Sequence, residues 1–336
     1  MPTPFPDFIP RGVIPAVLLP FLKDRSIDEH SFRKHLRDVA GVRGLSALTV
    51  NAHSTEVSTC SFNEQVRVLA TAVDEVGSKI PIVAGVSSES TAEAQRIARM
   101  STEQGASALL VFPPRVFFEG GMHRPSMIVE HYRRIAEASD LPLILFQFPE
   151  SGGGATPIDI ILQLADELPS LRAIKDYSNN PVIVERNVRL LQGRSRPVNV
   201  LSTHTAWLMG SLALGCNGVL SGSGSTIAAL QVEMFEAIQR NDLHAARAVS
   251  ERTQHLTSLF YANPFCDMHN RMKHAQVLLG RLPNAYARPP LLPLEQPEID
   301  RIAAALKAAG IAPQAEMTAS RAADVDTKNT RAIQYG

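Results

Sequence analysis

The order of apolar and amphipathic segments predicts a (β/α)₈ barrel followed by a helical extension. Eight short apolar runs, each followed by a helix-length segment, occupy roughly 230 residues, which matches such a barrel in count and size. Alternating strands and helices also indicate a parallel sheet with right-handed crossovers. A doubly wound sheet is the alternative, but no strand is followed by the GxGxxG pattern of a dinucleotide site. We therefore expect the barrel over residues 10–242, helices over 243–311 and a disordered polar tail over 312–336.

The expected elements follow from apolar runs and from the turn residues between them. Strands are expected at residues 13–21, 45–50, 81–86, 108–112, 142–148, 171–176, 198–202 and 218–222. Helices are expected at 28–39, 63–76, 90–105, 126–138, 157–167, after 179–181, at 203–214 and at 226–240. Ser126 is expected to cap the fourth helix, and Gly77 to end the second. Three further helices, near 244–260, 266–279 and 295–309, form the extension.

Composition narrows the class of protein. Lys plus Arg and Asp plus Glu both number 33, so no net basic field favours nucleic acid or an anionic membrane. No stretch approaches the length of a membrane span, and no signal peptide is recognisable. The three cysteines, Cys60, Cys216 and Cys266, form no metal or disulfide pattern, which favours a reduced cytoplasmic setting. We expect no cofactor and no metal, because no cluster of His, Asp and Glu recurs at the strand ends.

Lys175 is the one lysine of seven that falls inside a strand-like run. Lysine is seldom fully buried, and an apolar site lowers the pKa of its ammonium group. A neutral amine in such a site is a nucleophile toward carbonyl groups. The structural alternative is a lysine whose stem is buried while its head reaches water.

Other reactive side chains fall where a barrel has its active face, at the carboxyl ends of the strands. The loop 53–56 follows the second strand, Arg115 the fourth, and residues 221–225 the eighth. One lysine within a ring of hydroxyl groups suggests an imine-forming site for a 2-oxo acid. Backbone N–H groups and hydroxyls would hold the carboxylate of that acid.

The chain resembles the dihydrodipicolinate synthase / N-acetylneuraminate lyase family of class I aldolases and dehydratases. Its opening strand is similar to the PAxxTPF strand of that family, residues 51–56 to its GTTGE-type loop, and Ile174-Lys175-Asp176 to its IK[ED] lysine motif. Asn263-Pro264, Lys273 and Leu279-Gly280 resemble its NP…K…LLG helix. The resemblance covers residues 10–311. It implies a lyase acting on a pyruvate-type 2-oxo acid, assembled as a homotetramer or homodimer.

The chain departs from the family at residues that matter for proton transfer. Phe146 stands in place of the tyrosine that relays protons over the imine, and Pro114-Arg115 replace a second tyrosine. These changes predict poor dihydrodipicolinate synthase activity. The pattern Pro113-Pro114, Gln147 and Gly222-Ser223-Gly224 is more similar to members that resemble 2-keto-3-deoxy sugar acid dehydratases. Such a dehydratase is the alternative, and a binding protein without turnover is the second alternative.

The resemblance and the strand positions together assign roles. Lys175 forms the imine, and His53, with an unperturbed pKa near 6.5, or Tyr177 moves protons. Asp176 and Glu150 are weaker candidates for that proton transfer. The remaining expected substrate contacts are Ser54, Thr55, Phe146, Leu220, Gly222 and Arg115, the last for a second carboxylate.

Overall fold

A computed structural model describes residues 3–203 and 205–313. Eight parallel strands form one sheet in the order β1-β8-β7-β6-β5-β4-β3-β2. They are β1 (Gly12–Pro15), β2 (Leu48–Val50), β3 (Ile82–Val86), β4 (Ala108–Val111), β5 (Leu143–Gln147), β6 (Leu171–Asp176), β7 (Asn199–Ser202) and β8 (Gly218–Ser221). All eight expected strands are present, and the predicted barrel is confirmed.

Backbone bridges between the first and last strands of this order close the ring. Val13 pairs with Leu45, and Ala16 with Thr49, both in parallel. The Val17 N–H also donates to the Thr49 carbonyl at 3.0 Å. Because the ring closes, the carboxyl ends of all eight strands surround one opening.

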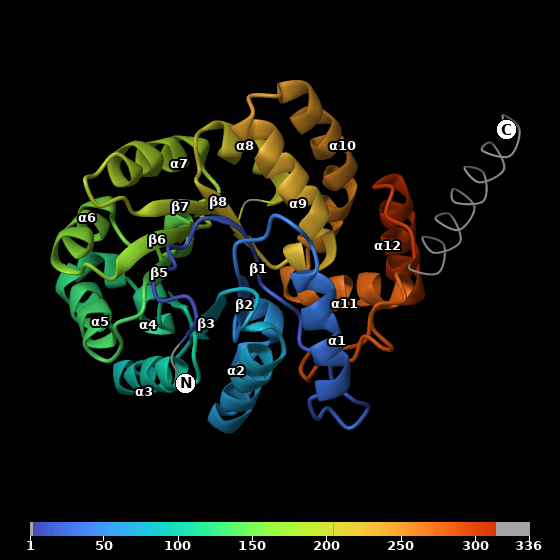
Figure 1. Cartoon of the computed structure of the whole chain (residues 1–336), viewed down its shortest axis with the longest axis horizontal. Helices are drawn as coiled ribbons and strands as arrows, with labels where there is room; N and C mark the ends of the chain where they lie inside the picture. Colours follow the sequence, from blue (N-terminus) through green and yellow to red (C-terminus); the bar gives the residue numbers. More distant parts are fainter. Residues whose placement is uncertain (1–2, 204, 314–336) are drawn as a thin grey trace, which may run out of the picture. The chain divides into compact units, whose positions relative to one another are not determined.

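Helices surround these strands, as Figure 1 shows for α2 to α9. The twelve α-helices of the described residues are α1 (Glu29–Ala40), α2 (Phe62–Val76), α3 (Thr91–Glu103), α4 (Arg115–Phe118), α5 (Pro125–Glu137), α6 (Ile158–Glu167), α7 (Pro181–Asn187), α8 (Leu208–Ala213), α9 (Gly224–Gln239), α10 (Leu243–Phe260), α11 (Met268–Leu278) and α12 (Gln296–Ala308). The expected helical extension is therefore present.

Local chemistry explains where several elements differ from expectation. Ser126 does not cap α5, because Pro125 takes the first helical position, where its missing N–H costs nothing. The first strand ends at Pro15 rather than at residue 21. The N–H of Leu18 instead donates to Nε2 of His35, at 3.3 Å. The short helix α4 was not expected at all, and in place of one helix over 203–214 the structure has the 3₁₀ turn Thr205–Trp207 followed by the six residues of α8.

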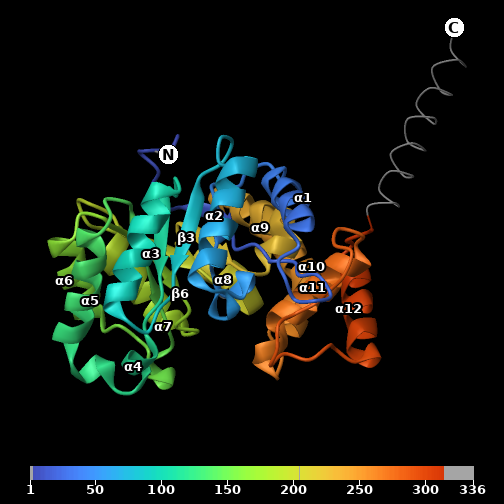
Figure 2. The ribbon, with the colours of Figure 1, turned by 90° about the horizontal axis from the view of Figure 1, so that it is seen from below.

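The barrel interior is filled by layers of side chains. One layer contains Ala108 and Ala173 from even-numbered strands and Ala47 just before β2, and the next contains Ile14, Val83, Ile144 and Leu201 from odd-numbered strands. In such barrels each layer usually takes its side chains from every second strand. Phe8 packs against this cluster from the N-terminal segment. Figure 2 shows that segment and α4 at opposite ends of the barrel.

The chain divides into two compact units. Residues 1–19 with 32–250 form one, which holds the whole sheet, and residues 20–31 with those from 251 onward form the other. In the second unit the fully buried Arg271 donates to Glu298 at 2.5 Å and to the Ala262 carbonyl at 2.7 Å. Lys273 donates to the Tyr286 carbonyl at 2.9 Å, so this second motif lysine has a structural partner. From residue 314 the expected tail lies outside the described residues.

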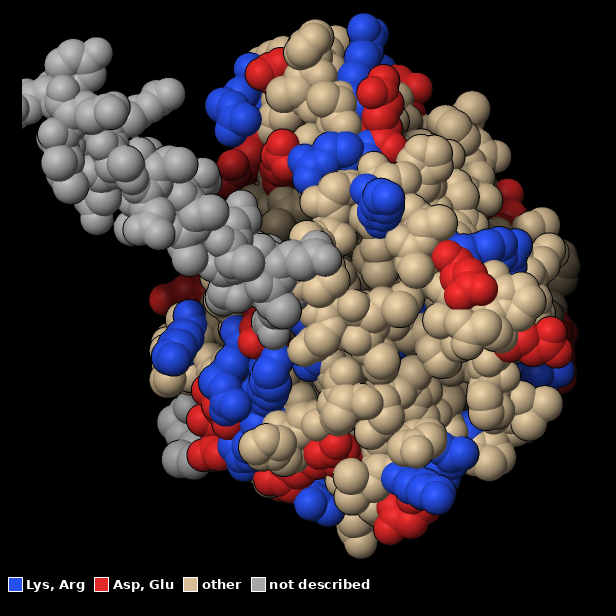
Figure 3. Space-filling model, turned by 90° about the vertical axis from the view of Figure 1, so that its right-hand side faces the viewer, with Lys and Arg blue, Asp and Glu red and all other residues tan. Residues whose placement is uncertain are grey.

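The surface carries both signs of charge. On the face drawn in Figure 3, basic and acidic side chains are interspersed around a broad uncharged area. Elsewhere on the surface, exposed ion pairs such as Arg133 with Glu130 bring opposite charges together. Within residues 3–203 and 205–313, no helix has the length and hydropathy needed to cross a membrane.

Candidate functional site

Lys175 lies near the carboxyl end of β6 with its side chain inside the barrel. The residue is only 6% exposed, and its Nζ lies 4.1 Å from the centroid of the Phe146 ring. Burial lowers the pKa of this amine from 10.5 to about 7. Among the described residues no carboxylate forms an ion pair with it. A large fraction of Lys175 is therefore a neutral amine at neutral pH.

An aromatic wall stands beside the lysine. Phe146 is the register partner of Lys175 on β5, and its ring lies 5.3 Å from that of Phe112 and 4.4 Å from that of Phe148. Neither Phe112 nor Phe148 was expected in the site. A signal was available, because both are phenylalanines at strand ends that follow the period-two alternation of the barrel interior.

His53 closes this wall from the loop after β2. It opens a short 3₁₀ turn, His53–Thr55, and its ring centroid lies 4.6 Å from that of Phe112 and 5.7 Å from that of Phe146. The residue is exposed, and its ring lies beside those of Phe112 and Phe146. Desolvation of the ring, and then the charge of Lys175, lower the pKa of His53 below 6.5. Both effects favour the neutral imidazole at pH 7.

The loop that carries His53 is held in place by backbone contacts. Asn51, in a left-handed conformation at φ 52°, donates from Nδ2 to the Gln65 carbonyl on α2 at 2.9 Å. A Cβ at Gly85 of β3 would lie 1.8 Å from the Asn51 carbonyl oxygen. Only glycine lets β3 approach the loop so closely.

Ser54 and Thr55 use their hydroxyl groups differently. The Ser54 Oγ is buried and has no hydrogen-bond partner among the described residues. Such a group costs stability unless something satisfies it, so it is available to a ligand. The Thr55 Oγ1 accepts from the Ala52 N–H at 2.5 Å and donates to the Ala52 carbonyl at 3.0 Å. The Thr55 side chain therefore stabilises the loop.

Three other expected residues lie with the lysine or the wall. Leu220 is fully buried in the interior cluster, and Gly222 follows directly after β8. The half-buried Tyr177 packs against that cluster, with its ring 6.2 Å from Phe148 and nearly perpendicular to it. Alternation along β6 thus turns Tyr177 to the same side as Lys175.

Three expected residues are placed elsewhere. The Arg115 side chain is 82% exposed and approaches Glu119 at 3.8 Å. The buried Asp176 carboxylate accepts from the Ser178 N–H and from Asn187 Nδ2, both at 2.8 Å. Glu150 approaches the Arg186 guanidinium at 3.8 Å. Each has a structural partner that accounts for it.

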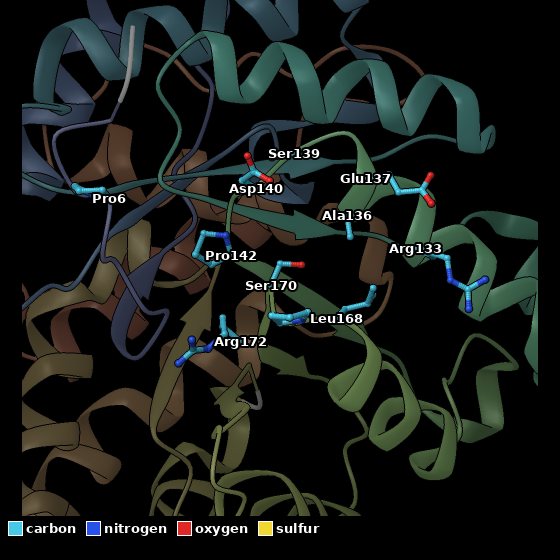
Figure 4. Close-up of a pocket in the computed structure, with 11 residues that line it drawn as sticks. Pro6, Arg133, Ala136, Glu137, Ser139, Asp140, Pro142, Leu168, Ser170 and Arg172 are labelled. Atoms are coloured by element: carbon cyan, nitrogen blue, oxygen red, sulfur yellow. The ribbon is translucent and has the colours of Figure 1, made fainter.

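A separate hollow of 530 Å³ lies at the amino ends of β5 and β6. Figure 4 shows its lining, in which Arg133 and Arg172 are accompanied by Glu137 and Asp140. None of the expected site residues lines it. Within the described residues, no three His, Cys, Asp or Glu side chains gather as a metal site requires.

A closed barrel with a desolvated lysine at the carboxyl end of its sixth strand is the arrangement of a barrel enzyme. The model of the dihydrodipicolinate synthetase family matches residues 9–309. The chain belongs to this family, and it is a lyase.

Curated relatives carry the same family name. A 4-hydroxy-tetrahydrodipicolinate synthase of Methanopyrus kandleri is 30% identical over 310 residues, covering 90% of this chain and 98% of the relative. A protein of that name from Methanothrix thermoacetophila is 31% identical over 244 residues, covering 72% and 79%.

Solved structures share the fold. YagE, a prophage protein of the dihydrodipicolinic acid synthase family from E. coli K12, solved in complex with pyruvate, has a TM-score of 0.82. It is 22% identical, with 90% of this chain and 99% of that chain covered. A monomeric dihydrodipicolinate synthase variant also has a TM-score of 0.82 at 23% identity, with 92% and 99% covered.

Replacing Lys175 by methionine should stabilise the protein. The wild-type lysine has a folded-state pKa of about 7, below its unfolded value, so burying its charge costs stability fully below pH 7. That cost fades as pH rises from about 7 toward 10.5. Lys175→Met should therefore raise the free energy of unfolding at pH 6, on the order of a few kcal/mol. Tm should rise by several degrees at pH 6 and by less at pH 9.

Thermal unfolding at both pH values measures this effect. Lys79→Met, at an exposed position, is the matched control and should leave Tm nearly unchanged. If Lys175→Met does not raise Tm at pH 6, or raises it equally at both pH values, the buried ammonium does not cost the wild type stability and the prediction is wrong.

Proposed function

We propose that this lyase acts on a 2-oxo acid through an imine formed by Lys175. The observation that carries the proposal is the desolvated Lys175 amine, whose pKa of about 7 leaves much of it unprotonated near neutrality. An amine in this state adds to a carbonyl carbon, whereas an ammonium ion cannot. The pyruvate named with the YagE structure supports a ligand of the same chemical class.

The imine explains the reaction class. Lys175 Nζ bonds to C2 of the acid, and the carbonyl oxygen leaves as water. Once protonated, the imine nitrogen draws electrons from the neighbouring carbons. A C–C or C–O bond beyond C3 can then break, so the same intermediate serves an aldolase or a dehydratase.

The residues around the lysine suit a small carboxylic acid. Ser54 offers a buried hydroxyl without a protein partner, which we assign to the substrate carboxylate. Phe146 and Leu220 would line the reacting carbons, and Gly222 leaves room beside them. Thr55 acts through the loop conformation. Arg115 could grip a second carboxylate only after leaving its exposed position beside Glu119.

Proton transfer is assigned to His53, with Tyr177 as the alternative. A general acid or base must lie within hydrogen-bond reach of the reacting group. Phe146 has no exchangeable proton, while the imidazole of His53 lies against the same ring that contacts Lys175. In its neutral form His53 can accept a proton on one nitrogen and donate from the other.

The absence of a hydroxyl on Phe146 favours dehydration or cleavage over condensation. The particular candidate is a 2-keto-3-deoxy sugar acid dehydratase.

Assembly and location complete the proposal. We assign a homotetramer or homodimer by resemblance, although one structure of this fold is described as a monomeric variant. A cytoplasmic setting agrees with the three free cysteines, Cys60, Cys216 and Cys266.

Reductive trapping tests the imine. Incubation with pyruvate and borohydride should add one pyruvate-derived mass to the peptide that contains Lys175. The trapping rate should rise as pH increases through about 7, because the neutral amine is the nucleophile. Neither Lys175→Ala nor Lys175→Arg should be trapped, because alanine has no amine and a guanidinium stays protonated. Trapping at another lysine, or at none with any 2-oxo acid, would refute the proposal.

Product analysis tests the reaction class. With a 2-keto-3-deoxy sugar acid as substrate, mass spectrometry should detect a product that has lost one water. The condensation of pyruvate with aspartate semialdehyde should be slow. Phe146→Tyr is the matched variant, because it adds only a hydroxyl, and it should raise the condensation rate. Wild-type condensation within the usual kcat range of about 1–10³ s⁻¹ would contradict the assignment.

Two substitutions separate the proton-transfer candidates. His53→Gln should leave imine trapping intact and lower kcat by about 10²-fold, the scale of a lost general acid or base. Tyr177→Phe should have little effect on kcat. The opposite pattern would transfer the role to Tyr177, and full activity in both variants would exclude the two residues together.

A further inference from the structure

Thr49 on β2 carries a buried hydroxyl that the fold does not use. The residue is 0% exposed, and its Oγ1 has no hydrogen-bond partner among the described residues. Nearly all buried polar groups are satisfied, so an unpaired hydroxyl at this depth requires an explanation. Valine has nearly the same shape and would avoid the cost.

The strand register places the Thr49 side chain inside the barrel. Thr49 pairs with Val83 on β3 and with Ala16 after β1, and both of those residues belong to the interior cluster. Paired residues of neighbouring parallel strands point to the same face of the sheet. The hydroxyl therefore belongs to the interior and not to the layer of helices.

The register also fixes how high Thr49 lies in the barrel. Lys175 pairs with Phe146 on β5, and the register of β5, β4 and β3, continued past the strand ends, leads to His53 after β2. In the other direction Lys175 pairs with Leu201, and Leu201 with Gly218. A barrel whose strands are staggered by eight residues around the ring changes height by one residue from each strand to the next. The four steps from β6 to β2 therefore place the residue four before His53, which is Thr49, at the height of Lys175.

Four even-numbered strands supply the layer at this height. Two strands away from β6, the residue at the same height lies two positions from the one that the pairings reach. It is Leu110 on β4, two residues before Phe112, and Leu220 on β8, two residues after Gly218. The members are thus Thr49, Leu110, Lys175 and Leu220. Because β2 and β6 are four strands apart in a ring of eight, Thr49 faces Lys175 across the barrel. Two leucines flank the space between the hydroxyl and the amine.

We propose that Thr49 is a further catalytic residue, whose hydroxyl donates a hydrogen bond to the C2 oxygen of the 2-oxo acid. This inference rests on the proposed imine at Lys175. Ser54, assigned to the carboxylate, lies five residues beyond Thr49 on the same side of the barrel. The carbon bonded to Nζ is C2, so the oxygen on C2 lies nearest to the layer that Thr49 shares with Lys175.

The hydrogen bond would act while the imine forms. The Nζ lone pair attacks C2, and the C=O electron pair moves onto oxygen, where negative charge develops. A proton from the nitrogen is transferred to that oxygen, giving a carbinolamine. Loss of the hydroxyl as water, with the second nitrogen proton, leaves the imine. A donor placed where the charge develops lowers the barrier to the first step.

Thr49→Val separates this role from a structural one. The variant removes a hydroxyl with no protein partner, so its Tm should equal or exceed that of the wild type. Its initial rate of borohydride trapping with pyruvate should fall about tenfold, the scale of one hydrogen bond to a charged group. Thr49→Ser keeps the hydroxyl and should trap within about threefold of the wild type. Thr71→Val makes the same change at a buried position on α2, away from the site, and should trap at the wild-type rate.

The outcomes distinguish this inference from the proposed function. Wild-type rates in Thr49→Val would overturn the role of Thr49 and leave the Lys175 imine standing. A fall in Tm that accompanies the slower trapping would also overturn it, since Thr49 would then be a structural residue. If the wild type itself is not trapped, both proposals fail.

Discussion

The loss of water around the Lys175 ammonium is the constraint on which the rest of the site depends. A charge in an apolar barrel is unfavourable, and the amine responds with a pKa near 7. The Phe146 ring, 4.1 Å away, offers the ammonium form a weak electrostatic contact without hydration. The same ring contacts His53, whose own protonation the lysine opposes. One aromatic side chain thus links the two groups assigned to imine formation and proton transfer.

The strand geometry decides which residue can take part. Lys175 and Asp176 are neighbours, yet alternation sends the lysine into the barrel and the carboxylate to Ser178 and Asn187 outside it. A shift of one residue would exchange their positions. The loop after β2 is fixed with similar strictness, because the Asn51 backbone packs directly against Gly85, where any side chain would clash. Position in the barrel, more than residue type, gives these side chains their chemistry.

The sequence was informative where a periodic pattern determines structure. Apolar runs located the eight strands, and the strand-end rule pointed to Lys175 and to the loop 53–56, whereas the role expected of Ser54 came with the family resemblance. Loops were less predictable, because their side chains depend on contacts made after folding. Thr55 turns its hydroxyl into its own loop, and Arg115 lies in solvent on an unexpected helix. The lowered pKa of His53 arises from desolvation of its ring and from the charge of Lys175, which comes from another strand.

The layer of Thr49, Leu110, Lys175 and Leu220 has a consequence for redesign of the barrel. A procedure that selects residues for packing alone would place apolar side chains at Thr49 and Lys175, since neither polar group has a hydrogen-bond partner within the described residues. The result would be a fully apolar layer in a more stable barrel. The activity proposed for this chain depends on these two polar groups, so selection for thermal stability alone would remove it.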